Sequence, residues 1–165
     1  MLARLGKLPA AAWFGAIALA CFAALAFALT AQHRFEMRPC AWCVLQRLIY
    51  FGIAIAALVG VLARSRPLRG AVVLVLLALC AAGISAALWQ NLVAASADSC
   101  DLTLAERIVS SLKLDEWLPD VFVAWAPCKD AAVKVLGVAF ELWSFALYLM
   151  LGAAALAALA ALRRG

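Results

Sequence analysis

Charged residues are scarce in this sequence. They make up 14% of its 165 residues, whereas soluble domains carry about 25%, so an ordinary soluble domain is excluded. The arginines form no stripe with interleaved aromatic residues, so nothing indicates a nucleic-acid partner. The sequence also has a single histidine, His33, and no second Cys-x-x-Cys motif. A zinc site built from paired ligand motifs is therefore disfavoured.

Apolar residues are abundant instead. They form 69% of the sequence, and the mean hydropathy is +1.06. Four apolar runs reach the roughly 20 residues that a bilayer-spanning helix needs, and open sheet edges cannot lie in lipid. The sequence predicts an all-α membrane protein, a four-transmembrane-helix bundle that forms one integral-membrane domain over residues 1–165. The predicted spans are about Pro9–Thr30, Val44–Ala63, Ala71–Leu92 and Leu136–Leu162.

Lysine and arginine are sorted between the connections. The two termini and the short second connection carry only basic charges, with no acidic residue among them: Arg4, Lys7, Arg64, Arg66, Arg69, Arg163 and Arg164. Because basic segments stay on the cytoplasmic side, we expect both termini there. The connections at about 31–43 and 93–135 then face outward, into the periplasm if the membrane is a bacterial inner membrane.

The six cysteines divide according to this topology. Cys21 and Cys80 fall within spans, where cysteine acts as a small buried hydrophobe. The outward-facing cysteines are Cys40, Cys43, Cys100 and Cys128. Since disulfides persist in an oxidising outer compartment, two disulfides are favoured over a zinc site.

Cys40 and Cys43 form a Cys-x-x-Cys motif where a polar segment meets the second span. Such a pair can close into a disulfide and reopen, and one thiol usually has a lowered pKa. Pro39 favours a helix start, and the helix dipole would favour a thiolate at Cys40. Arg47 lies on the same helical face as Cys43. It is predicted to stabilise a Cys43 thiolate and to bind a carbonyl oxygen; alternatively, it extends to lipid headgroups.

The long third connection, about 93–135, carries apolar and aromatic residues that a solvated loop would not need. Thr103-Leu104-Ala105-Glu106 is a capping box, which predicts a helix start. An apolar stripe follows at helical spacing, formed by Leu104, Ile108 and Leu112. With Trp117 and Trp125 beside it, this pattern predicts a short amphipathic helix that contacts membrane lipid on the outer face. A small packed ectodomain is the alternative.

These features together resemble the DsbB family of bacterial inner-membrane proteins. The resemblance covers nearly the whole chain: the four spans, the Cys-x-x-Cys at the head of the second span and the two cysteines in the second outer loop. It extends to local motifs, which are Gln46-Arg47, Glu116-Trp117-Leu118-Pro119, Val121-Phe122-Val123-Ala124, Leu136-Gly137 and Trp143. It implies an enzyme, a protein-disulfide oxidoreductase that reoxidises a periplasmic DsbA-like thiol oxidase. The electrons would pass to the membrane quinone pool, either ubiquinone or menaquinone.

The resemblance also implies residue roles. Reduced DsbA attacks a Cys100–Cys128 disulfide, with Cys100 as the mixed-disulfide partner. Released Cys128 then attacks Cys40 of a Cys40–Cys43 disulfide, and Cys43 faces the quinone, which Arg47 holds. A histidine found in the family near the outer end of the third span is absent here. The sequence has Trp89-Gln90-Asn91 at that place, where Gln90 or Asn91 could donate a hydrogen bond.

Four other interpretations stay open on the sequence. One is a specialised DsbB paralogue with a dedicated partner. Another is a relative of vitamin K epoxide reductase, although in that family the Cys-x-x-Cys lies late in the chain. A membrane metal-binding protein would use the four outer cysteines together. A scaffold with two structural disulfides would leave Arg47 and the Cys-x-x-Cys spacing unexplained.

Overall fold

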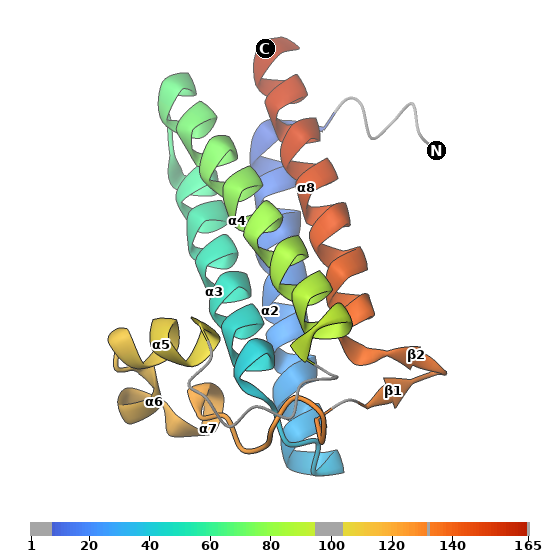
Figure 1. Cartoon of the computed structure of the whole chain (residues 1–165). Coiled ribbons are helices and arrows are strands. Elements are labelled where there is room, and N and C mark those ends of the chain that lie inside the picture. The colour runs from blue at the N-terminus through green and yellow to red at the C-terminus, as the bar shows by residue number, and fades with distance from the viewer. Residues whose placement is uncertain (1–7, 95–103, 132, 165) are drawn as a thin grey trace.

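Four long helices form the body of the computed structural model, which describes residues 8–94, 104–131 and 133–164. Each is long and apolar enough to cross a membrane, so the predicted all-α four-helix membrane bundle is confirmed. Figure 1 shows the four helices running in roughly the same direction along one bundle, with the lower end of α2 extending beyond α4 and α8. They are α2 (Ala10–Phe35), α3 (Ala41–Leu62), α4 (Arg66–Leu92) and α8 (Phe140–Arg164).

The helix ends follow local backbone chemistry. Helix α2 continues five residues past the predicted end at Thr30 and stops at Glu36, whose left-handed backbone (φ 51°) ends the helix. His33 therefore lies in the last turn of α2 rather than in a loop. Helix α3 starts at Ala41 with the extended residue Cys40 as its N-cap, so Pro39 precedes the helix rather than occupying its first position.

Small residues let the helices approach one another closely, as apolar helices in lipid require. A Cβ atom on Gly60 would lie 2.8 Å from the ring of Phe14, and one on Gly83 would lie 2.4 Å from the ring of Tyr148. The Tyr148 ring also stacks on that of Tyr50, with a centroid distance of 4.4 Å. The bundle interior is therefore filled to contact at these points.

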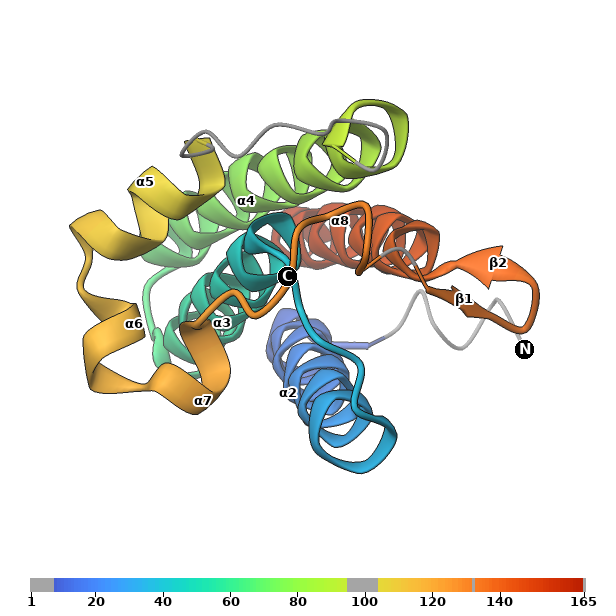
Figure 2. The ribbon, with the colours of Figure 1, turned by 60° about the horizontal axis from the view of Figure 1, so that its bottom comes forward.

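Three short helices pack beside α3 at one end of the bundle (Figure 2): α5 (Leu104–Ser111), α6 (Leu114–Trp117) and α7 (Pro119–Phe122). Helix α5 starts where the capping box predicted, although Thr103 lies outside the described residues. Its buried residues are Ala105 and Val109, whereas Leu104 and Leu112 are exposed. Leu104 and Leu112 of the predicted stripe thus point away from the bundle, whereas its third member, Ile108, is half-buried and packs against the core. Val109, from the neighbouring row, joins an apolar cluster with Val44 and Phe122. The exposed Leu104, Leu112 and Trp117 keep an apolar surface available at this end.

A small hairpin precedes α8, with strands β1 (Lys134–Val135) and β2 (Val138–Ala139) paired antiparallel. Its two turn residues, Leu136 and Gly137, have φ of 54° and 81°, as a tight two-residue hairpin turn requires. For this reason the fourth helix starts at Phe140, four residues after the predicted span start at Leu136. Figure 1 shows the hairpin and α5–α7 at one end and the α3–α4 connection and the C-terminus at the other.

Candidate redox site

Three of the four cysteines that were predicted to face outward meet at the head of α3. Cys40, the N-cap, is fully buried, and its Sγ atom lies 3.3 Å from the Sγ atom of Cys43 one turn later. The thiol of Cys128, in the segment after α7, forms a hydrogen bond with the thiol of Cys40. Cys100 lies outside the described residues. Cys40 therefore lies between Cys128 and Cys43, in reach of both.

The hydrogen bond between Cys128 and Cys40 sets the acidities of these two thiols in opposite directions. It lowers the pKa of Cys128. It raises the pKa of Cys40 far above the ordinary value, and a hydrogen bond with Cys43 and burial add to this effect. Cys128 is thus favoured as the thiolate of the pair, which is the attacking form in thiol–disulfide exchange.

A side-chain amide from α4 reaches Cys43. Gln90 Nε2 donates a hydrogen bond to Cys43 Sγ at 3.2 Å, and Gln46 Nε2 donates to Gln90 Oε1 at 2.7 Å. The backbone carbonyl of Gln46 in turn accepts a hydrogen bond from Tyr148 Oη at 3.0 Å. Both glutamines are buried, so these linked hydrogen bonds fix the orientation of the Gln90 amide that faces the Cys43 sulfur.

Arg47 is buried at the same end of α3, but none of its described hydrogen bonds is to Cys43. Its Nη1 atom donates to Gln32 Oε1 at 2.6 Å and to the carbonyl oxygen of Val121 at 3.0 Å. The sequence placed Arg47 and Cys43 on one helical face, and both do line one cavity. The direct partner of the Cys43 sulfur is nevertheless Gln90, because α4 crosses α3 at this level.

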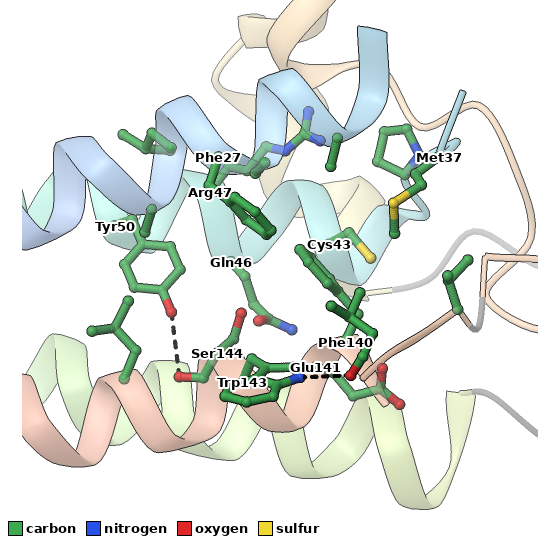
Figure 3. A pocket seen from close by; sticks show the side chains of 18 of the residues that line it. Phe27, Met37, Cys43, Gln46, Arg47, Tyr50, Phe140, Glu141, Trp143 and Ser144 are labelled. Carbon is green, nitrogen blue, oxygen red and sulfur yellow. Dashed lines mark hydrogen bonds between the residues drawn. The ribbon is translucent and has the colours of Figure 1, made fainter. Parts of the chain in front are cut away.

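That cavity has a volume of about 590 Å³, within the range of small-molecule sites. Its walls are apolar side chains of α2 and α8, including Leu25, Phe27, Leu147 and Met150. Polar groups gather at the end near the head of α3, where Figure 3 shows Cys43 and Gln46 of α3 on the side toward α8 and the Arg47 guanidinium directed toward α2. The arrangement presents a thiol, two amides and a guanidinium to an otherwise apolar space.

The sequence-predicted site is thus assembled in part. Cys40, Cys43, Cys128 and Arg47 come together, whereas the buried Cys21 and Cys80 lie deeper within α2 and α4. Within residues 8–94, 104–131 and 133–164, His, Cys, Asp and Glu side chains form no group of three that could hold a metal ion. Sequence reasoning gave no role to Gln32, Gln46 or Glu141. Their only signal was a polar residue at the edge of an apolar run.

Comparison with known proteins decides the family. The family described as "Disulfide bond formation protein DsbB" matches residues 10–158 of the chain. The chain belongs to the DsbB family. "Disulfide bond formation protein B" of Escherichia coli (strain K12) is 31% identical over 141 residues, covering 82% of this chain and 79% of the relative. The protein of the same name from Shigella flexneri serotype 5b (strain 8401) matches to the same extent.

Membership of the DsbB family confirms the resemblance drawn from the sequence motifs. With four helices able to span a membrane, the chain is a multi-pass membrane protein of disulfide bond formation. The convergence of three cysteines beside an apolar cavity is consistent with that role.

Proposed function

We propose that this DsbB-family protein reoxidises a periplasmic DsbA-type dithiol oxidase and passes the electrons to a membrane quinone. Electrons enter at Cys100 and Cys128, move to Cys40 and Cys43, and leave into the cavity. A DsbA-type oxidase is a strong oxidant, with a potential of about −120 mV. Its reoxidation therefore needs a still stronger acceptor, and the apolar cavity favours a lipid-soluble one.

One observation carries this proposal: Cys128, Cys40 and Cys43 follow one another from the outer loop to the cavity. Cys128 and Cys40 are hydrogen-bonded, Cys40 and Cys43 are 3.3 Å apart, and Cys43 lines the cavity. A disulfide can be handed along such a series because each exchange needs only a thiolate in contact with the next sulfur. A scaffold with two structural disulfides would not need this sequence of contacts.

The residues of the chain divide the work. Cys128, whose pKa is lowered by the Cys40 thiol, attacks Cys40 of the Cys40–Cys43 disulfide. The S–S bond between Cys40 and Cys43 breaks, a Cys40–Cys128 bond forms, and Cys43 leaves as a thiolate that accepts a hydrogen bond from Gln90. Cys100, released when the second DsbA thiol closes the DsbA disulfide, then attacks Cys128. The Cys40–Cys128 bond breaks, the Cys100–Cys128 disulfide re-forms, and Cys40 and Cys43 remain as a dithiol that the quinone oxidises.

The cavity residues fit a quinone. The apolar walls suit an isoprenoid-bearing ring, and the buried amides and guanidinium at the outer end suit its carbonyl oxygens. A bound quinone supplies a two-electron, two-proton acceptor. Gln90 and Gln46 orient Cys43 toward it, and Arg47 provides a positive charge at the same wall of the cavity.

Anaerobic mixing of the purified protein with reduced DsbA and a short-chain ubiquinone tests the proposal. Quinone absorbance and the redox state of the cysteines are followed together, and a menaquinone analogue is compared. Wild type should reduce quinone, and Cys40→Ser or Cys43→Ser should abolish turnover. Cys21→Ala and Cys80→Ala are the matched controls and should keep it. Wild-type turnover in either Cys40→Ser or Cys43→Ser would refute the proposal.

A further inference from the structure

Glu141 is a buried carboxyl group with no part in the function proposed above. It lies in the first turn of α8, is 4% exposed and lines the same cavity as Cys43. Figure 3 shows it on α8, across the cavity from the α3 residues. A carboxyl group is costly to bury without compensation, so its position calls for a physical reason.

The contacts of Glu141 leave one oxygen available. Oε1 accepts a hydrogen bond from Asn91 Nδ2 of α4 at 2.9 Å. Among the described residues Oε2 has no hydrogen-bond partner, and the carboxyl forms no ion pair with a lysine or arginine. Asn91 thus fixes the side chain, while Oε2 stays free to carry a proton.

The other groups around the cavity narrow the choice of proton donor. The described lining residues that titrate or carry charge are Arg38, Cys43, Arg47, Tyr50 and Glu141. Arginine does not give up its proton in proteins, and tyrosine ordinarily keeps its proton to about pH 10. Cys43 is itself the electron donor. Helix α4 contributes the neutral amides of Gln90 and Asn91 at this end. Among the described residues that line the cavity, Glu141 is therefore the one carboxyl group.

We propose that Glu141 is the proton donor to the quinone reduced at Cys43, an inference that rests on the proposed function. In the balanced reaction two electrons leave the Cys40 and Cys43 sulfurs as the S–S bond forms. Two protons leave the thiols, and two protons join the quinone oxygens to give the quinol. Glu141 delivers one of these protons from Oε2 and regains one from the outer side. Met37 and Arg38 of the first connection line the cavity there.

Glu141→Gln keeps the size of the side chain and an acceptor for Asn91 but removes the acidic carboxyl group. The matched control is Glu116→Gln, which neutralises an exposed carboxyl in α6. With reduced DsbA and a short-chain ubiquinone, Glu141→Gln should lower kcat about 100-fold, the low end of the range for positioned acid–base groups. Mixed-disulfide formation with DsbA should not change, and Glu141→Asp should recover part of the rate.

A second readout does not depend on turnover. Infrared difference spectra on adding the short-chain ubiquinone should contain a carboxyl band that is present in wild type and Glu116→Gln and absent in Glu141→Gln. If wild type is active and Glu141→Gln matches its kcat, or if the band persists in Glu141→Gln, the role of Glu141 is overturned and the quinone reductase proposal survives. If wild type reduces no quinone, both proposals fall. Should Glu141→Gln not fold, Glu141→Asp is compared with wild type. A lowered kcat together with a shifted carboxyl band supports the role of Glu141, and a wild-type kcat with an unshifted band overturns it.

Discussion

Gln32 of α2 uses both ends of its side-chain amide to hold the redox loop on the bundle. Its Oε1 atom accepts a hydrogen bond from Arg47 Nη1 at 2.6 Å, and its Nε2 atom donates to the carbonyl oxygen of Asp120 at 2.9 Å. Arg47 also donates to Val121. Helices α2, α3 and α7 are thereby joined a few residues before Cys128. We predict that this clamp keeps Cys128 at Cys40.

The size of the effect follows from the hydrogen bonds that Gln32→Ala removes. Each is worth about 1 kcal/mol net, and Gln32 is only half-buried, so the loss should total about 1–2 kcal/mol. Because a tenfold change corresponds to about 1.4 kcal/mol, the proximity of Cys128 to Cys40 should fall about 5- to 30-fold. Gln32→Glu keeps the acceptor for Arg47 and should lose less.

Proximity is measured as the effective concentration of the Cys40–Cys128 pair in glutathione redox buffers, using protein with Cys43 and Cys100 replaced by serine. His33→Ala is the control, since His33 is exposed in the same helical turn and lacks a described hydrogen bond. Its effective concentration should equal that of the parent protein. An unchanged value in Gln32→Ala would show that the loop is held by other contacts, such as the bond from Trp125 N–H to the Pro39 carbonyl.

Two further predictions concern acidity and packing. Because the Cys40 thiol lowers the pKa of Cys128, Cys40→Ala should raise that pKa and slow the alkylation of Cys128 at pH 7. The expected slowing is about threefold per pKa unit, since a thiolate of higher pKa is also more nucleophilic. Cys40→Ser keeps a hydrogen-bond donor, so an equal alkylation rate in the two variants would contradict the hydrogen bond as the cause of the lowered pKa. Gly83→Ala should cost about 1–3 kcal/mol in unfolding assays, since its Cβ would meet the Tyr148 ring at 2.4 Å. Gly70→Ala, with nothing within 4 Å, should be neutral or stabilising, and equal melting of the two glycine variants would contradict the packing argument.

The features of this protein that the sequence predicted best depend on the average hydropathy of long segments. Four runs of apolar residues are enough to predict α2, α3, α4 and α8, because any spanning segment must satisfy its backbone within one helix. The position of Cys40 and Cys43 at the head of α3 followed from the place where polar sequence meets the apolar run. Local backbone chemistry shifted the edges, as at the turn of Leu136 and Gly137.

The sequence was a poorer guide to which side chains of a helix face its neighbouring helices. The predicted stripe of Leu104, Ile108 and Leu112 has helical spacing, yet only Ile108 packs against the core, and the buried residues are the neighbouring Ala105 and Val109. Periodicity shows that a helix has an apolar side, but several adjacent rows can serve as that side when all are apolar. The choice depends on which row meets a complementary surface, in this case Val44 of α3.

The same limit applies to the redox site. The spacing of four residues between Cys43 and Arg47 predicts one shared face of α3, and it holds, since both line the cavity. Spacing along one helix cannot, however, show which residue of another helix reaches that face. Gln90 contacts the Cys43 sulfur only because the crossing of α3 and α4 brings it there, with Gln46 fixing its orientation. A neutral amide thus occupies the region where the family resemblance led us to look for a histidine. An amide can donate a hydrogen bond to sulfur but does not act as an acid or base at ordinary pH, which is why the proposed proton transfer is assigned to the Glu141 carboxyl rather than to Gln90.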